Sequence, residues 1–288
     1  MPTANRTNTG LSERIRALPA AIRYAPSIAA VLFALLLWGG EPLSELLTGQ
    51  DPVLARIERS GVMRVGMDAS YPPFEWVDAQ GQFQGYDVDL ARALGERLGV
   101  DVSLVDVHFD GLYDALEAQR CDLIISALPF DPMMTRDLGY SRAYFDAGLV
   151  LVGRSGGSDI VAIEDLVGRR VAVELGSEGH MLARLWQRDK GLDVELVVVR
   201  EPQELVASLA DGQAEILICD SVTARCYLAQ EPSLRIVGPM LSSEPYVIAV
   251  PIEATELIDL VDEALSDWEA SGQLGEWEER WLGGPRLP

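Results

Sequence analysis

Hydrophobic and polar residues alternate with two different periods along the chain after residue 50. Residues 62–67 have the period of a short strand, and 74–77 resume an extended run after the turn at 68–71 and Pro72-Pro73. Apolar residues recur at helical spacing over 86–97, and the first turn of this predicted helix contains acidic residues. The pattern predicts a strand that delivers polar side chains to one edge of a sheet, backed by a helix.

The same two periods continue to the end of the chain. Further strands are predicted at 102–105, 123–125, 149–152, 170–174, 194–199 and 216–219. Helices are predicted at 51–59, 112–119, 181–188, 202–210, 222–228, 255–268 and 275–281. Strands that alternate with helices predict an α/β fold with parallel sheets, and two such series in tandem predict two lobes.

The motifs lie in an order that resembles a known family. Besides 62–97 they are Phe109-Asp110-Gly111-Leu112, 121–126, 140–148, 166–177, 216–221 and 245–250. This set resembles the family 3 solute-binding proteins, the polar amino-acid receptors of ABC transporters. The resemblance implies a two-lobe, type II periplasmic-binding-protein-like α/β fold in which each lobe is a central sheet flanked by helices. It also implies that the chain crosses between lobes twice, near 146–149 and 243–247.

On this basis five regions are expected. Residues 51–147 and 245–288 form lobe 1, and 148–244 form lobe 2. Residues 1–23 are a basic cytoplasmic N-terminus, because the basic flank of an exported segment stays inside. No charge occurs in 24–40, which predicts a membrane or signal helix, and 41–50 is a linker. An uncleaved signal-anchor that tethers an extracytoplasmic protein to the membrane is preferred to a cleaved signal peptide.

Composition excludes several classes of protein. A net charge of −22 and a pI near 4.4 leave no basic face for nucleic acid. The three cysteines, Cys121, Cys219 and Cys226, fit neither a disulfide framework nor a metal site. Buried free thiols are expected, with a Cys219–Cys226 bridge as the lesser alternative.

The sequence contains no motif for catalysis. It has no Walker A loop, GxGxxG, HExxH or GxSxG, and its two histidines, His108 and His180, are far apart in sequence. We therefore expect no catalytic residues, no metal and no cofactor.

The candidate ligand residues come from the resemblance. A site for a zwitterionic amino acid needs an arginine-like cation to pair with the ligand's carboxylate and acidic side chains to pair with its ammonium group. Asp220 matches the family's ammonium-binding aspartate, with a helix N-cap as the alternative role. The remaining matches are Asp68 and Tyr71 (alternatively turn residues), Phe109 (alternatively a core aromatic), the strand end Ser126, Ala127 and Leu128, and Ser177.

Three positions depart from the family pattern. The carboxylate-binding arginine falls on Met134, a preceding hydroxyl on Pro129, and the hydroxyl after Ser177 on Glu178. Arg136 and Arg142 are the candidates to replace the missing arginine, although a surface role is expected for Arg136. If neither does, Asp68, Glu178 and Asp220 leave an acidic cleft that favours a cationic or polyhydroxy ligand over an ordinary amino acid.

The resulting hypothesis is capture of a small polar solute, without catalysis, by a monomer that delivers it to an ABC importer. The permease and ATPase would be separate chains. Two alternatives stay open: a cyclohexadienyl-dehydratase-like lyase with Glu178 as a buried general acid, and a sensor module that reports to a membrane partner.

Overall fold

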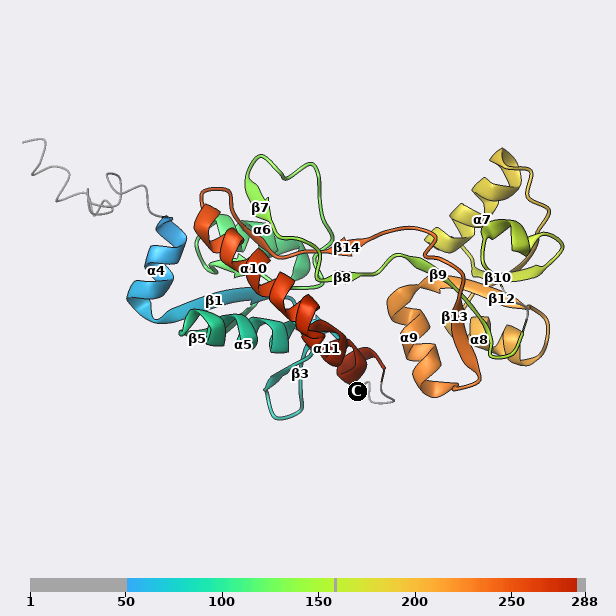
Figure 1. Ribbon diagram of the computed structural model, residues 1–288, viewed down its shortest axis with the longest axis horizontal. Helices are drawn as coiled ribbons and strands as arrows, with labels where there is room; N and C mark the ends of the chain where they lie inside the picture. Colours follow the sequence, from blue (N-terminus) through green and yellow to red (C-terminus); the bar gives the residue numbers. More distant parts are fainter. Residues whose placement is uncertain (1–50, 158–159, 284–288) are drawn as a thin grey trace, which may run out of the picture. The chain divides into compact units, whose positions relative to one another are not determined.

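The computed structural model describes residues 51–157 and 160–283 (Figure 1). The predicted cytoplasmic segment 1–23, the apolar segment 24–40 and the linker 41–50 lie outside these residues. Within the described part of the chain, no helix combines the length and apolarity that crossing a membrane requires.

The first lobe is built on a five-stranded sheet with the strand order β5-β1-β6-β15-β7. Its strands are β1 (Val62–Met67), β5 (Asp101–Asp106), β6 (Leu123–Ile124), β7 (Leu138–Tyr140) and β15 (Ala249–Pro251). β1 is parallel to β5 and β6, whereas β15 runs antiparallel to β6 and β7. A three-stranded sheet of β2 (Ser70–Tyr71), β3 (Glu75–Val77) and β4 (Phe83–Gln84) follows β1.

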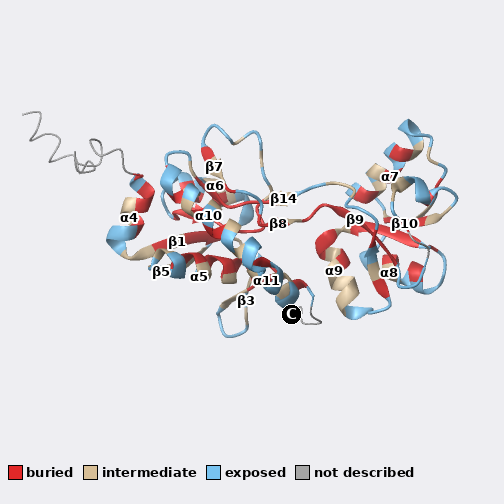
Figure 2. Cartoon of the chain, viewed as in Figure 1, coloured by how far each residue is buried: buried red, intermediate tan, exposed pale blue. Residues whose placement is uncertain are grey.

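Helices from both ends of the described chain cover the first sheet. They are α4 (Pro52–Ser60), α5 (Tyr86–Leu98), α6 (Leu112–Glu117), α10 (Thr255–Ser271) and α11 (Gln273–Leu282), with a short 3-10 helix η1 (Phe109–Gly111) before α6. The apolar side chains of α5, α10 and α11 join those of β1 in one buried cluster, and α6 contributes to a second. In Figure 2 most of β1 is coloured as buried.

The second lobe repeats the plan with the strand order β11-β10-β12-β9-β13. Its strands are β9 (Leu149–Arg154), β10 (Arg170–Glu174), β11 (Glu195–Val199), β12 (Ile216–Asp220) and β13 (Leu234–Val237). Its helices are α7 (Glu178–Asp189), α8 (Pro202–Ala210) and α9 (Ser221–Gln230), with a 3-10 helix η2 (Ile163–Leu166). α7 packs in one buried cluster and α8 and α9 in another, so the sheet is covered by helices on both faces.

Two short strands join the lobes. β8 (Phe145–Asp146) pairs with β14 (Pro245–Tyr246) where the chain leaves the first lobe and returns to it. The Asp146 carboxylate accepts hydrogen bonds from the backbone N–H groups of Gly148 (2.9 Å) and Glu244 (2.8 Å) and from Ser243 Oγ (2.7 Å). One side chain therefore ties both crossing segments together.

The α/β class and the two-lobe architecture are as expected, but the parallel sheets are not. β9 runs antiparallel to β12 and β15 antiparallel to β6, so both sheets are mixed. Each of these strands enters its sheet directly from a crossing segment, without a preceding crossover helix, and an antiparallel neighbour needs no such crossover.

The boundaries of helices and strands also differ from the pattern. α7 begins at Glu178, three residues before the predicted start, because the Ser177 side chain accepts a hydrogen bond from the His180 N–H. The pattern does not predict β2, β4, β7, β8, β13, β14 or β15, since each is short or lacks a distinct alternation. β2 occupies the second half of the predicted turn at 68–71.

The three cysteines are free thiols. Cys121 and Cys219 are buried and Cys226 is half-buried. The alternative Cys219–Cys226 bridge is not present.

Candidate functional site

A pocket of about 270 Å³ lies in the first lobe, where β1 and β6 end. We call it the first-lobe pocket. It is lined by Asp68, Ser70, Tyr71, Glu75, Phe109, Ser126, Ala127, Pro129 and Tyr246. Two carboxyl groups and three aromatic rings belong to this lining, which, within the described chain, includes no basic side chain.

Asp68 connects three separate segments at this pocket. Its Oδ2 atom accepts a hydrogen bond from the Phe109 backbone N–H (2.8 Å), and its Oδ1 accepts one from Ser70 Oγ (2.6 Å). The Asp68 backbone N–H donates to Ser126 Oγ (2.9 Å). Asp68 therefore has the predicted turn role and also presents its charge at the pocket.

Two aromatic rings of the pocket are open to solvent. Tyr71 is 44% exposed and Phe109 43% exposed, so both rings are accessible to a solute in the pocket. Tyr71 stacks on the buried Phe74 ring, with centroids 5.8 Å apart and planes at 8°. The ring of Phe109 is not a core aromatic, because η1 exposes it. Exposed ring faces beside a carboxylate attract cations.

The candidate residues of the second lobe follow strands β10 and β12. Ser177 caps α7 and Glu178 is exposed in its first turn. Asp220 ends β12 and caps α9, accepting a hydrogen bond from the Thr223 N–H at 2.7 Å. The carboxyl ends of parallel strands are the usual ligand side of an α/β sheet.

Charges of the second lobe act on Tyr71, in the lining of the first-lobe pocket, and on Glu244, which lies outside that lining. Burial, with added repulsion from Glu178 and Asp220, raises the pKa of Glu244. Burial also raises the pKa of Tyr71, a pocket residue, and the negative charge of Asp220 adds to the effect. Acidic groups of both lobes therefore influence one region.

Residues 63–284 match the sequence model of the bacterial extracellular solute-binding proteins, family 3. The chain belongs to this family. The L-arginine-binding protein of Pseudomonas aeruginosa is 28% identical over 228 residues, which covers 76% of this chain and 87% of that protein.

Solved structures of other proteins share the fold. The L-cystine solute receptor of Neisseria gonorrhoeae, in an unliganded open conformation, has a TM-score of 0.71 at 26% identity, covering 81% of this chain and 97% of that one. An ancestral cyclohexadienyl dehydratase has a TM-score of 0.68 at 28% identity, covering 80% and 95%.

The residue at which the family's arginine is expected, Met134, lies away from the first-lobe pocket. Met134 lines a separate hollow with Tyr113 and Leu138, and it packs against the core cluster around α6. Arg136 is exposed and does not line the pocket. Arg142 forms an ion pair with Glu269 of α10. None of these side chains supplies a cation to the pocket.

Leu128 is placed differently from Ser126 and Ala127. Its side chain is buried in the core, and its carbonyl oxygen accepts a hydrogen bond from the Val247 N–H (2.9 Å). Ser126 and Ala127 line the pocket as expected, and Ala127 has a positive φ of 41°. The backbone at this strand end is held in a conformation that residues other than glycine seldom adopt.

Three polar groups at the pocket are not among the candidates from the sequence: Ser70, Glu75 and Tyr246. Glu75 lies in the predicted extended run beside Phe74, and it is 1% exposed. A carboxylate at an inward strand position was the available signal, since acidic side chains are rarely buried without a partner. Tyr246 gave no signal, because its strand β14 reaches the pocket only through the second chain crossing.

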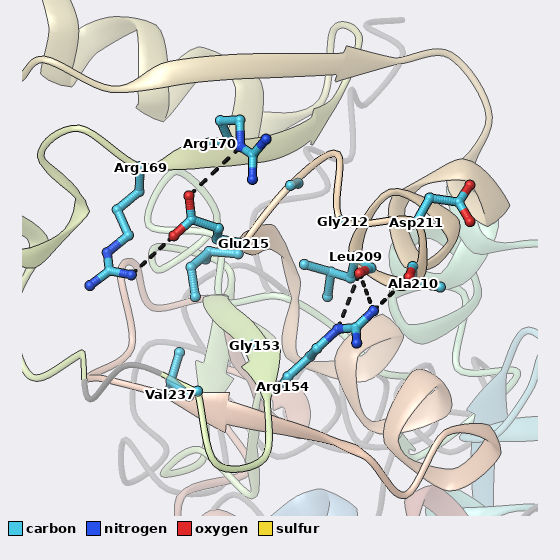
Figure 3. A pocket seen from close by; sticks show the side chains of 13 residues that line it. Gly153, Arg154, Arg169, Arg170, Leu209, Ala210, Asp211, Gly212, Glu215 and Val237 are labelled. Atoms are coloured by element: carbon cyan, nitrogen blue, oxygen red, sulfur yellow. Dashed lines mark hydrogen bonds and ion pairs between the residues drawn. The ribbon is translucent and has the colours of Figure 1, made fainter.

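A second pocket, of about 430 Å³, lies in the second lobe (Figure 3). It is at the amino ends of β10 and β12, opposite to the strand ends that carry Ser177 and Asp220. Its arginines already have protein partners. Arg154 donates to the carbonyl oxygens of Leu209 and Ala210, and Glu215 pairs with Arg169 (3.1 Å) and Arg170 (3.7 Å). These contacts account for the arginines as structural groups.

Within the described residues no group of His, Cys, Asp and Glu side chains is arranged to hold a metal ion. His108 is exposed, and His180 Nδ1 accepts a hydrogen bond from the Gly176 N–H (3.1 Å).

Proposed function

We propose that this protein captures a small polar solute with a cationic group, such as a basic amino acid or a related amine. It then delivers the solute to an ABC importer whose permease and ATPase are separate chains. The observation that carries the proposal is the first-lobe pocket, which places the Asp68 carboxylate beside the exposed rings of Tyr71 and Phe109, with no basic side chain in the described lining.

The chemistry of this pocket favours a positive ligand group. A carboxylate beside aromatic faces attracts an ammonium or guanidinium group through both charge and ring quadrupole. A solute carboxylate placed against Asp68 would instead meet no cation to neutralise it, because Met134 stands where the family's arginine is expected, so we expect the cationic end of the solute to face Asp68. Asp220 and Glu178 of the second lobe add negative charge on the opposite side of the solute.

The ligands named for two relatives bear on this choice differently. The protein from Pseudomonas aeruginosa is named for L-arginine, a cationic amino acid, and the structure from Neisseria gonorrhoeae for L-cystine. L-cystine carries as many carboxylates as ammonium groups, so only the first name favours a cationic solute. We place this protein outside the cytoplasm, as a monomer tethered to the membrane by residues 24–40.

A thermal-shift screen of the purified, ligand-stripped protein tests the proposal. L-arginine, L-lysine, putrescine, L-glutamine, L-leucine and citrate cover cationic, neutral and anionic solutes. A solute that binds only the folded protein raises the Tm in proportion to ln(1 + [L]/Kd). We expect a rise with at least one cationic solute and none with citrate. A low-micromolar Kd for a neutral L-amino acid would defeat the cationic preference.

Paired variants connect a positive result to the pocket. Asp68→Asn removes the charge at constant size, and we expect it to weaken binding roughly tenfold to a hundredfold. Glu58→Gln makes an equivalent change on the exposed face of α4 and should leave affinity unchanged. Equal loss in both variants would mean that net charge, and not this pocket, controls binding.

A lyase function is the second candidate, favoured by the similarity to the ancestral cyclohexadienyl dehydratase. Its substrate class carries carboxylates, and Glu178, the candidate general acid, is exposed at the start of α7. We therefore propose binding without catalysis. Release of carbon dioxide from a prephenate-like acid, abolished by Glu178→Gln, would establish the lyase instead.

A sensor role can be distinguished from transport by the membrane protein that the solute-bound form contacts. Reconstitution with an ABC permease and ATPase should give solute-dependent ATP hydrolysis if the protein serves transport. Solute-dependent association with a membrane kinase, without transport, would favour the sensor.

A further inference from the structure

Two buried carboxyl groups lie together beneath the first-lobe pocket. Glu75 on β3 is 1% exposed and Asp87 on α5 is fully buried, and the two side chains bind adjacent residues of one strand end, Ser126 and Ala127. Outside the pair, Glu75 Oε1 accepts a hydrogen bond from Ser126 Oγ (2.7 Å). Asp87 Oδ2 accepts from the Ala127 N–H (2.5 Å) and from the Tyr144 hydroxyl (3.0 Å).

The remaining oxygen of each group has no donor. Glu75 Oε2 and Asp87 Oδ1 are buried, and neither has a hydrogen-bond partner in the described chain. Neither carboxyl group forms an ion pair there. Two ionised carboxylates in this position would repel each other in a medium that screens charge poorly. A single proton removes the conflict, because a neutral carboxyl group donates to the adjacent carboxylate.

We propose that Glu75 and Asp87 hold one proton between Oε2 and Oδ1, and that this proton fixes the Ser126 hydroxyl as a hydrogen-bond acceptor toward the pocket. The inference rests on the proposed function in one respect only, that the first-lobe pocket receives the solute.

The direction of the hydrogen bonds follows from the place of the proton. Because the shared proton lies at Glu75 Oε2, Oε1 carries no hydrogen and can accept one. The single hydroxyl hydrogen of Ser126 therefore points to Oε1. The same Ser126 oxygen accepts from the Asp68 N–H (2.9 Å). Because the hydroxyl hydrogen of Ser126 is already donated to Glu75, the hydroxyl can offer a solute in the pocket only a lone pair. A solute group that donates, such as an ammonium N–H, satisfies it, whereas a carbonyl or carboxylate oxygen does not.

The carboxyl pair also fixes the backbone of the strand end that lines the pocket. Asp87 accepts the Ala127 N–H, and Ala127 has the positive φ noted above. Glu75 and Asp87 are therefore positioning residues, which orient Ser126 and Ala127 without replacing them as ligand contacts.

The ionisation of the pair agrees with this geometry. Burial, and then the charge of Asp87, raises the pKa of Glu75 well above its usual range. Burial raises the pKa of Asp87 to about 6. The groups that face the pair are Asp68, Tyr71, Tyr86 and Tyr144. Burial raises the pKa of all three phenols, so they stay neutral and Asp68 adds only negative charge.

The sign of the pH dependence follows. The folded protein keeps a proton that unfolded Glu75 releases near its usual pKa of 4.5. The unfolding free energy therefore falls as pH rises from that value through the raised pKa of the folded state. Glu75→Gln imitates the protonated side chain, because its amide donates to Asp87 and its oxygen accepts from Ser126. It should remove this part of the pH dependence.

Infrared spectroscopy of the ligand-free protein tests the shared proton directly. At neutral pH we expect a C=O band of a protonated carboxylic acid that shifts on isotopic labelling of glutamate. The band should be lost in Glu75→Gln and kept in Glu58→Gln, an exposed control on α4. If Glu75→Gln does not fold, the isotope shift of the band in the labelled wild-type protein still shows whether a glutamate carries the proton. A spectrum without this band at neutral pH overturns the proposal, whatever the protein binds.

Binding of L-arginine then tests the orientation of Ser126. In Glu75→Gln the Kd should depend less on pH than in the wild-type protein, over the range in which the folded pair loses its proton. Ser126→Ala should weaken binding roughly tenfold, the effect of one hydrogen bond to a charged donor. An unchanged Kd in Ser126→Ala overturns the orientation. Absence of all binding, with the infrared band present, would instead reject the proposed function and leave the shared proton in place.

Discussion

Single carboxylates in this protein bind backbone N–H groups and present charge at the same time. Asp220 accepts the Thr223 N–H at the start of α9, and its charge reaches Tyr71 at the first-lobe pocket. One alanine substitution would remove both effects, so the two must be separated by choice of side chain.

Substitutions of Asp220 should separate the cap from the charge. Asp220→Ser keeps a hydroxyl that accepts from Thr223, so we expect stability close to that of the wild type and loss of solute affinity of roughly tenfold or more. Asp220→Ala should lose the affinity and also about 1 kcal/mol of unfolding free energy. Urea unfolding and calorimetric titration measure the two effects. Wild-type affinity in Asp220→Ser would remove Asp220 from the solute site.

Glycines differ in what their missing side chain permits. Gly85 precedes α5 with φ +130°, and a Cβ there would meet the Phe74 carbonyl oxygen at 2.0 Å. Gly275 lies inside α11 with no atom within 4 Å of a built Cβ.

Alanine at these two positions should have opposite effects. Gly85→Ala should destabilise by roughly 3 kcal/mol or more, because both the backbone conformation and the contact oppose it. Gly275→Ala should stabilise by about 0.5–1 kcal/mol, since alanine favours a helix. Thermal unfolding of the two variants checks both signs. Stabilisation by Gly85→Ala would contradict the close approach of Phe74.

At the scale of whole elements, one side chain joins the first and the last helical regions of the first lobe. Asp51 Oδ1 accepts from the N–H groups of Val53 (2.8 Å) and Leu54 (2.9 Å) at the start of α4, and its Oδ2 accepts from the Leu257 N–H (2.9 Å) in α10. Asp51 is 3% exposed, so these donors have no access to water as a substitute.

Removal of the Asp51 side chain should therefore lower the unfolding free energy more than removal of an ordinary helix cap. We expect Asp51→Ala to lower the unfolding free energy by roughly 2–4 kcal/mol, because buried N–H groups of two helices lose their acceptor. Asp101→Ala, at an exposed position at the start of β5, serves as the control and should change little. Equal values for the two variants in chemical denaturation would argue against a shared cap.

At the scale of the whole molecule, the crossing segments decide how the two lobes are connected. Asp146 binds three donors from both segments, and Ser221 Oγ donates to its carbonyl oxygen (2.7 Å). Although burial opposes it, the hydrogen bonds from Ser243, Glu244 and Gly148 lower the pKa of Asp146 below its usual 3.8.

The contribution of Asp146 should depend on pH in a defined direction. A depressed pKa stabilises the folded state above the unfolded value, and that stabilisation is lost as pH falls through the folded-state pKa. Asp146→Asn should thus be less stable than wild type by about 1 kcal/mol at neutral pH, with the difference shrinking below about pH 4. Unfolding curves recorded at several pH values test this. A constant difference across that range would mean that the carboxylate charge is not responsible.

The sequence by itself determined the local elements and the candidate chemistry. Spacing and capping signals predicted β1, α5 and α8 almost to the residue, and Asp51-Pro52 and Gly61 predicted both ends of α4. These signals are local, because a cap or a periodic face depends on residues within one or two turns. The motif order was sufficient for the family, and the match over 63–284 confirmed it.

The tertiary structure decided everything that depends on segments distant in sequence. Strand direction in the mixed sheets and the place of Tyr246 at the pocket follow from the two chain crossings. The position of Met134 outside the pocket follows from the packing of the segment between β6 and β7 against the cluster around α6. The pairing of Glu75 with Asp87 was likewise hidden, since neither residue alone shows that its partner is another acid. Contacts of this kind depend on how separate elements pack, and no local pattern encodes that packing.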